Sequence, residues 1–194
     1  MSFLSSPFFH SLLALLYLWL PLEGAEAFRL FTQPLSIPER GEVTSYALLT
    51  GNNRFSFLPP AGWQISANAE KREVTLLSHD QIAGISLKIV VDGIGAREQQ
   101  DLNKWRQEVL RRYPGAKIVN ESTCYSRDVR GICFEFLRIA SKKAKLSTRL
   151  AFVSFSDGTV EFLLTAPSEK SEDYTFIFAN LLTSFHSERC SATK

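Results

Sequence analysis

The chain has 194 residues, with 22 Lys and Arg against 20 Asp and Glu, so its formal net charge is +2. Nucleic-acid binders usually carry a dense basic stripe, because their affinity comes from many simultaneous phosphate contacts. The basic residues of this chain are distributed along it, so we expect no nucleic-acid partner. The length suits one domain whose core needs neither a metal nor a dense disulfide framework.

The first 27 residues predict an export signal. An apolar run over residues 8–20 is followed by Pro21 and then by Ala25-Glu26-Ala27, a pattern that signal peptidase accepts. Cleavage before Phe28 leaves 22 basic and 18 acidic residues, a net charge of +4, in an exported protein of the periplasm or exterior. A retained membrane anchor is the alternative, because residues 1–10 contain no Lys or Arg. The apolar run is short for a bilayer, which needs about 20 residues.

Turn-forming residues divide the rest of the chain. Residues 28–52 are rich in turn formers and poor in periodic apolar residues, so we expect an extended N-terminal arm. One domain should occupy residues 53–188, followed by a flexible tail at 189–194.

Hydrophobic periodicity predicts the elements of this domain. Alternating apolar residues indicate strands near residues 54–58, 63–65, 73–77 and 85–91. From Arg97 to Tyr113 the apolar spacing becomes three or four, which predicts an amphipathic helix ended by Pro114-Gly115. Four further strands should follow, over 116–125, 132–140, 146–155 and around 160–162, before a second helix ending near Phe185. This order of four strands, helix, four strands, helix predicts an α+β domain with an antiparallel sheet covered by helices.

The pair Asp-Gly at residues 157–158 is the strongest local turn signal. It suits the positive backbone angles of a tight hairpin turn between two apolar strands. Centring the turn on this pair places Phe155 opposite Val160 and Val153 opposite Phe162, all on one face of the sheet.

Three cysteines remain after signal cleavage, Cys124, Cys133 and Cys190. A hairpin centred between residues 128 and 129 would place Cys124 directly opposite Cys133, on the face away from Phe134. We expect these two cysteines to form a disulfide in an oxidising compartment, with Cys190 free. Two reduced, half-buried thiols are the alternative.

Both ends of the domain resemble the Mog1/PsbP-like superfamily. The likeness is carried by the opening segment Phe55-Ser56-Phe57-Leu58-Pro59-Pro60-Ala61-Gly62-Trp63 and by the closing segments 156–167 and 176–185, and it spans residues 53–188. The resemblance implies an α/β/α sandwich with an antiparallel sheet between helices. It also implies binding or assistance of other macromolecules, as in photosystem II extrinsic subunits, a small-GTPase partner and bacterial envelope proteins. No catalytic residue carries over.

No motif for catalysis, a metal or a cofactor stands out, so we expect none of them. His79 and His186 lie on different elements, and His79-Asp80 is interpreted as a turn rather than a metal site. The chain lacks both a Gly-x-Ser-x-Gly elbow and a Gly-rich phosphate loop. Glu121 and Glu135 could meet across a hairpin as an acid–base pair, although solvated strand charges are commoner.

One cluster of charge stands out in the sequence. Five basic residues occur without an intervening acid: Arg138, Lys142, Lys143, Lys145 and Arg149. On a hairpin loop they would attract an acidic protein, lipid or glycan surface, over about 10 Å at 0.1 M salt. A solubilising turn is the alternative.

These observations favour a non-enzymatic accessory or binding protein that acts through a surface on an envelope or extracellular partner. The alternatives are an envelope hydrolase with a dispersed site and a small-ligand carrier with a pocket between the sheet and the C-terminal helix. A deep pocket with convergent polar groups would favour either alternative. Trp63 and Trp105 lie inside apolar patterns and are interpreted as core residues. The sequence leaves the oligomeric state open.

Overall fold

The computed structural model describes residues 28–38, 41–91, 101–127, 129–139 and 144–190. The predicted signal peptide lies outside the described residues, as do Lys142, Lys143 and the end of the predicted tail. Within the described part of the chain, no helix is both long enough and apolar enough to cross a membrane.

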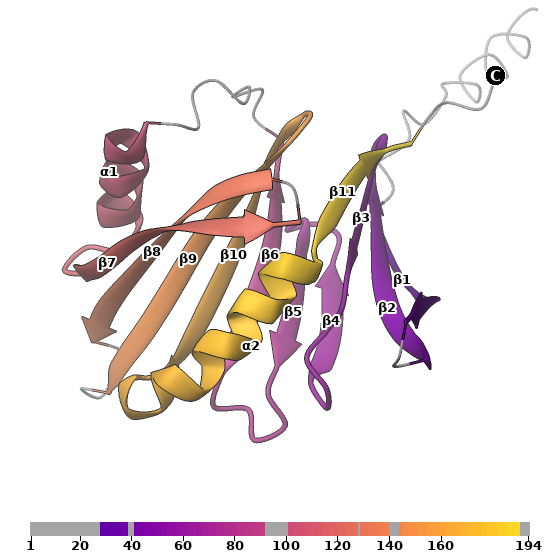
Figure 1. Cartoon of the computed structure of the whole chain (residues 1–194). Helices are drawn as coiled ribbons and strands as arrows, with labels where there is room; N and C mark the ends of the chain where they lie inside the picture. Colours follow the sequence, from indigo (N-terminus) through magenta and orange to yellow (C-terminus); the bar gives the residue numbers. More distant parts are fainter. Residues whose placement is uncertain (1–27, 39–40, 92–100, 128, 140–143, 191–194) are drawn as a thin grey trace, which may run out of the picture.

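The strands of the fold form two antiparallel sheets (Figure 1). The four-stranded sheet has the order β1-β2-β3-β11, with bounds Arg29–Ile37, Gly41–Thr50, Asn53–Phe57 and His186–Arg189. The seven-stranded sheet has the order β4-β5-β6-β10-β9-β8-β7. Its strands are β4 Gln64–Asn68, β5 Glu73–Leu77, β6 Gly84–Val90, β7 Lys117–Ser126, β8 Val129–Ile139, β9 Lys145–Phe155 and β10 Gly158–Pro167.

Two α-helices follow β6 and β10, as the periodicity predicts. Helix α1 spans Leu102–Arg112 and begins after Asp101, whose carboxylate accepts hydrogen bonds from the backbone N–H groups of Asn103 and Lys104. Helix α2 spans Ser171–Ser184, after a short 3-10 turn at Ser168–Lys170. The predicted order of four strands, helix, four strands and helix is confirmed as far as α2, but strand β11 follows it at His186–Arg189, where the flexible tail was expected to begin.

Each helix covers one face of the seven-stranded sheet with its own core. On one face, α2 and the four-stranded sheet enclose a core that includes Phe55, Phe162 and Phe178. On the other face, α1 packs through Trp105 and Val109 onto β8 and β9, where the rings of Trp105 and Phe152 stack 4.0 Å apart. The layers are thus helix, sheet, helix, the predicted α/β/α arrangement.

The segment predicted as an extended arm is instead a β-hairpin. Strands β1 and β2 pair from Arg29 opposite Leu49 to Ile37 opposite Gly41, and β2 continues the pairing onto β3. The turn formers that suggested a linker are compatible with this hairpin, because Pro34 lies on the edge strand β1, where a missing N–H is tolerated.

Both predicted hairpin registers are wrong by two residues. Val160 lies opposite Val153, and Phe155 lies opposite Gly158. Gly158 is therefore the first residue of β10 rather than part of the turn. A Cβ at residue 158 would lie 2.1 Å from the carbonyl oxygen of Val90 on β6, so glycine is required by this close approach. The grouping of these residues on one face is confirmed, because a shift of two residues leaves each side chain on its original face.

The cysteine hairpin shows the same shift. Cys124 lies opposite Gly131, and Cys133 lies opposite Ser122. A Cβ at Gly131 would come within 2.5 Å of the Phe152 carbonyl oxygen and 2.9 Å of the Cys124 sulfur, so glycine makes room for both. Cys124 and Cys133 are diagonal neighbours, and both are free thiols in the structure, as is Cys190. The register that motivated their disulfide is wrong, and the disulfide itself stays a prediction.

The last strand forms one edge of the four-stranded sheet. Strand β11 pairs with β3, and the backbone N–H of Cys190 donates to the Asn52 carbonyl at 2.7 Å. The turn before β10 holds this edge in place, because Asp157 accepts from the Asn53 amide at 2.8 Å and forms an ion pair with Arg189 at 3.0 Å. These contacts connect the edge of the four-stranded sheet to the seven-stranded sheet.

Candidate functional site

The predicted basic cluster contains two arginines that bond to other residues of the fold and one exposed lysine among its described residues. The Arg138 guanidinium donates to the Thr148 and Thr165 hydroxyls at 3.2 and 3.3 Å and lies 5.6 Å from the centre of the Tyr113 ring. Arg149 lies opposite Glu135 in the register and forms an ion pair with it at 3.0 Å. Both arginines are therefore used within the fold. Lys145 is exposed at the start of β9, and Lys142 and Lys143 lie outside the described residues.

Glu121 and Glu135 do not form an acid–base pair. Glu121 accepts two hydrogen bonds of 2.6 Å from Arg106 of α1, and this contact lowers the pKa of Glu121. Glu135 pairs with Arg149 instead, and the alternation of β8 sends its side chain to the face opposite the one covered by α1. Each carboxylate is paired with its own arginine.

His79-Asp80 lies in a turn, as predicted. The Asp80 carboxylate accepts from the Ser78 hydroxyl at 2.7 Å and from the Ile82 backbone N–H at 3.3 Å, and the Ser78 bond lowers the pKa of Asp80. Among the described residues, no group of three or more His, Cys, Asp and Glu side chains could hold a metal ion.

The larger hollow, about 1100 Å³, is a groove between α2 and the four-stranded sheet. We call it the apolar groove, and residues of β1, β2, the loop after β3, β4 and α2 line it. No Asp, Glu, Lys, Arg or His is among the described residues that line it. Its lining includes the aromatic and apolar side chains of Tyr46, Pro59, Pro60, Trp63, Phe176 and Ile177.

Local structure fixes the walls of the apolar groove. Pro59 and Pro60 restrict the backbone after β3, and the Trp63 N–H donates to the Pro60 carbonyl at 3.3 Å. The Ser184 hydroxyl at the end of α2 accepts from the Leu58 N–H at 3.0 Å, which ties this loop to the helix. Trp63, which the apolar pattern places in the core, is half-buried: it packs against the core and also contributes to the groove wall.

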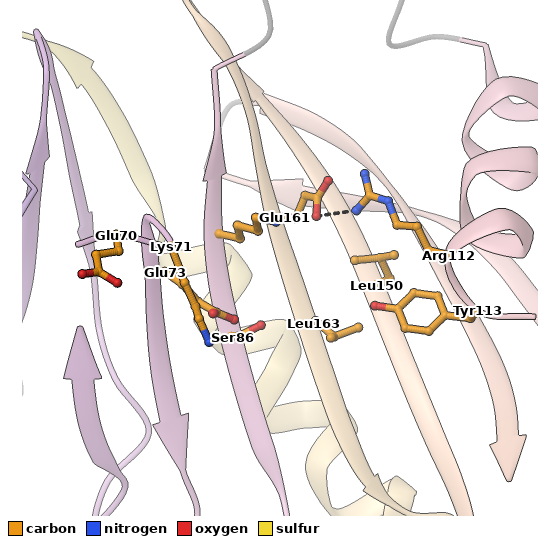
Figure 2. A pocket seen from close by; sticks show the side chains of 10 residues that line it. Glu70, Lys71, Glu73, Ser86, Arg112, Tyr113, Leu150, Glu161 and Leu163 are labelled. Atoms are coloured by element: carbon orange, nitrogen blue, oxygen red, sulfur yellow. Dashed lines mark hydrogen bonds and ion pairs between the residues drawn. The ribbon is translucent and has the colours of Figure 1, made fainter. Parts of the chain in front are cut away.

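The smaller hollow, about 550 Å³, lies on the opposite face of the seven-stranded sheet. Helix α1 covers β8 and β9 there but leaves β5, β6 and β10 with a polar surface. Glu73, Lys88 and Glu161 lie side by side across these three strands in the register. We call this hollow the charged pocket, and Figure 2 shows its lining.

An ion pair closes one end of the charged pocket. Arg112, from the last turn of α1, donates to Glu161 at 2.6 Å and to Glu108 at 2.6 Å. The Glu161 side chain is only 8% exposed, so its carboxylate depends on this partner. Burial opposes charge on Arg112, but its bonds to Glu161 and Glu108 outweigh that effect and raise its pKa. Hydrogen bonds from Arg111 and Arg112 lower the pKa of Glu108 to about 2.

Comparison with known proteins was informative only at the level of structure. No family model and no curated relative matches the sequence. The solution structure of PsbP from the cyanobacterium Synechocystis sp. PCC 6803 is similar with a TM-score of 0.54 at 13% identity, covering 87% of this chain and 96% of that chain. The chain has the Mog1/PsbP-like fold.

Two further solved structures of the Mog1/PsbP-like fold are less similar. The Ran-binding protein Mog1p of Saccharomyces cerevisiae gives a TM-score of 0.48 at 8% identity, over 81% of this chain and 96% of that one. LpqN of Mycobacterium tuberculosis, described as involved in cell envelope biogenesis, gives 0.43 at 12% identity, over 82% of this chain and 91% of that one. At such identities the shared fold transfers no site residue, so the function must be argued from the two hollows.

Sequence reasoning missed both hollows of this Mog1/PsbP-like chain, although each left a signal. Phe176 is apolar but falls outside the helical spacing of the buried residues of α2, and it is 72% exposed. Lys88 and Glu161 are charged residues on the polar faces of β6 and β10, where Ser86 and Thr159 also lie. An exposed aromatic residue and a charged strand face therefore marked the two sites.

Proposed function

We propose that the chain is an exported, non-enzymatic binding protein that holds an apolar segment of a partner protein in the apolar groove. The observation that carries this proposal is a surface groove whose described lining contains no ionic side chain and whose rim residue Phe176 is 72% exposed. Contiguous exposed apolar surface of this kind marks interaction sites, and aromatic residues dominate the binding energy of protein interfaces.

The openness of the groove favours a protein partner over a small ligand. Of its described lining residues only Leu181 is buried, so a small molecule lying there would keep much of its surface in water. Pockets for small ligands usually bury about 70–90% of the ligand surface. A partner protein supplies the missing cover itself, and its apolar segment would match a lining without charge.

The groove also offers little for catalysis. Tyr46 is its one ionisable residue among those described, and it packs against the ring of Phe57 at 6.0 Å. General acid–base chemistry needs a titratable group within hydrogen-bond reach of the reacting atoms, usually paired with a second one. The groove therefore supports the binding function rather than a hydrolase.

Photo-crosslinking tests the groove most directly. A benzoylphenylalanine at position 176 of the full chain, expressed in its own compartment, should crosslink to one partner protein through an apolar segment of it. The same group at position 110 is the matched control, because Leu110 is also an exposed apolar residue on a helix, 44% exposed, on the other face of the sheet.

The identified segment then gives the affinity test. Phe176→Ser should weaken its binding about tenfold or more, since truncating a central aromatic contact costs roughly 2 kcal/mol. Leu110→Ser should leave the affinity unchanged. Crosslinks to a second copy of this chain, to lipid alone, or equally from both positions would contradict the proposal.

Export itself remains part of the proposal, with two direct tests. The intact mass of the exported product should correspond to a chain that begins at Phe28. A membrane-bound species that retains residues 1–27 would show an anchor instead.

Peptide mapping without reduction should find the Cys124–Cys133 disulfide with Cys190 free, and a bond from Cys190 to either cysteine would refute that pairing.

A further inference from the structure

We propose that the charged pocket is a second binding site, for a small uncharged polyhydroxylated ligand of the size of a mono- or disaccharide. The pocket lies on the face of the sheet opposite the apolar groove, so this inference does not depend on the function proposed for the groove. Its volume of about 550 Å³ is within the range of small-ligand sites.

The pocket has an apolar floor between two polar sides. Leu150 of β9 and Leu163 of β10 lie at its base (Figure 2). Tyr113 stands on one side, with its hydroxyl directed over Leu163, and Ser86 of β6 lies on the other side. A ligand with C–H groups on one face and polar groups around its edge fits such a site.

Tyr113 is held firmly in this position. Its ring packs 4.9 Å from the ring of Phe136, and the Arg138 guanidinium lies 5.6 Å from its centre on the sheet side of α1. Burial raises the pKa of Tyr113, so the phenol keeps its proton and can donate a hydrogen bond at neutral pH. The site therefore presents a neutral donor over an apolar floor.

The positive and negative side chains of the pocket lining are equal in number, and some of them form no ion pair with a described residue. Arg112 and Glu161 neutralise one another at one end of the pocket. The side chains of Lys71, Lys88, Glu70 and Glu73 line the pocket without an ion pair or hydrogen bond to any described residue. They present both donors and acceptors to a ligand.

This balance indicates the class of ligand. An anion would be attracted by the lysines and repelled by the three glutamates of the lining, whereas a cation would be attracted by the glutamates and repelled by the lysines. A hydroxyl group both donates and accepts, so one neutral polyol can bond to ammonium groups, carboxylates and hydroxyls together. Its C–H face would cover Leu150 and Leu163.

Calorimetric titration of the full chain with a sugar panel tests the proposal. Neutral glucose, mannose, maltose and trehalose are compared with glucuronate, glucosamine and glucose 6-phosphate, and with the zwitterion leucine. At least one neutral sugar should bind with a Kd on the order of 1 mM, and more tightly than its charged relatives. Raising the salt concentration should change that Kd by less than about twofold, because no net charge is paired on binding.

Variants locate the site. Tyr113→Phe keeps the ring packing and removes only the hydroxyl, and Lys88→Gln removes an exposed ammonium group. Each should weaken sugar binding about fivefold, the value of one lost hydrogen bond. Lys145→Gln is the matched control, an exposed strand lysine outside the pocket that should leave binding unchanged. Melting curves for all three variants check that the fold is intact.

Several results would overturn the proposal. These are the absence of binding by every neutral sugar at tens of millimolar, tighter binding of a charged relative or of leucine, and wild-type affinity in both pocket variants. Loss of sugar binding in Phe176→Ser would place the site in the apolar groove instead. Loss of partner binding in that variant with sugar binding retained would separate the two sites.

Discussion

The backbone of Gly158 lies so close to Val90 that a Cβ at residue 158 would come within 2.1 Å of the Val90 carbonyl oxygen. The obstacle is backbone in the neighbouring strand β6, which is paired with β10 from Thr159 opposite Val90 to Thr165 opposite Gly84. No side-chain rotation can relieve such a contact, so the sheet itself would have to move.

Gly158→Ala should therefore destabilise the protein by about 2–4 kcal/mol, measured by denaturant unfolding. Gly84→Ala is the control on the partner strand, since its new Cβ would lie 3.2 Å from the flexible end of Leu77 and at an ordinary contact distance of 3.6 Å from the Leu76 carbonyl oxygen. The control should lose less than about 1 kcal/mol. Equal effects of the two substitutions would show that β6 and β10 are not in this close contact.

Arg112→Met should destabilise the fold by about 2–3 kcal/mol, because it leaves the Glu161 carboxylate buried without a cation. Arg111→Met is the control: Arg111 also bonds to Glu108, but its side chain is 72% exposed, so the change should destabilise the fold far less than Arg112→Met.

Acid unfolding should depend on Glu108. Its pKa is lowered from 4.5 to about 2 in the folded protein by Arg111 and Arg112. The stability this carboxylate contributes is full above the pKa of the unfolded chain and is lost as pH falls through the folded pKa. Glu108→Gln should therefore flatten the pH dependence of unfolding between about pH 5 and pH 2. A slope identical to that of the wild type over this interval would contradict the assignment.

Association with acidic surfaces should depend on Lys142, Lys143 and Lys145, because the structure shows Arg138 and Arg149 engaged within the fold. The triple Lys→Ser variant should bind vesicles containing anionic lipid more slowly at low salt, with a flatter salt dependence. Its melting temperature should barely change, since replacing an exposed surface charge changes the free energy of unfolding by no more than about 0.5 kcal/mol.

The matched control removes the same amount of charge elsewhere, at Lys104, Lys117 and Lys170. It should bind at the wild-type rate. If wild type binds no anionic vesicle, or if both triple variants lose binding equally, the basic cluster is a solvated turn and contributes no recognition.

Alternation along the strands predicted which face each side chain occupies but not which residues are opposite. Val153, Phe155, Val160 and Phe162 share one core in the structure, as expected, yet each pairs two residues away from its predicted partner. A two-residue slip leaves the hydrophobic pattern unchanged, so the position of the turn decides the register. The turn lies at Ser156 and Asp157 rather than at Asp157 and Gly158, and Gly158 is already opposite Phe155.

The N-terminal hairpin and the two hollows were missed for a related reason. Strands β1 and β2 contain Pro34 and many polar residues, and their pairing is stabilised by β3 and by packing of Leu30 against the main core. The charged pocket depends on the register that brings Glu73, Lys88 and Glu161 together, and no single segment of sequence contains that register. Long-range pairing therefore limits what local patterns can predict.

We expect the pairing of β11 with β3 to form late in folding. Phe55 of β3 is fully buried, and it lies opposite Ser187 near the far end of the described chain. A contact between such distant segments closes late, because the entropy of a long loop must be overcome first. Until β11 arrives, the edge of β3 stays open and the four-stranded sheet is incomplete. A chain still being synthesised would therefore keep this sheet open until Arg189 is available.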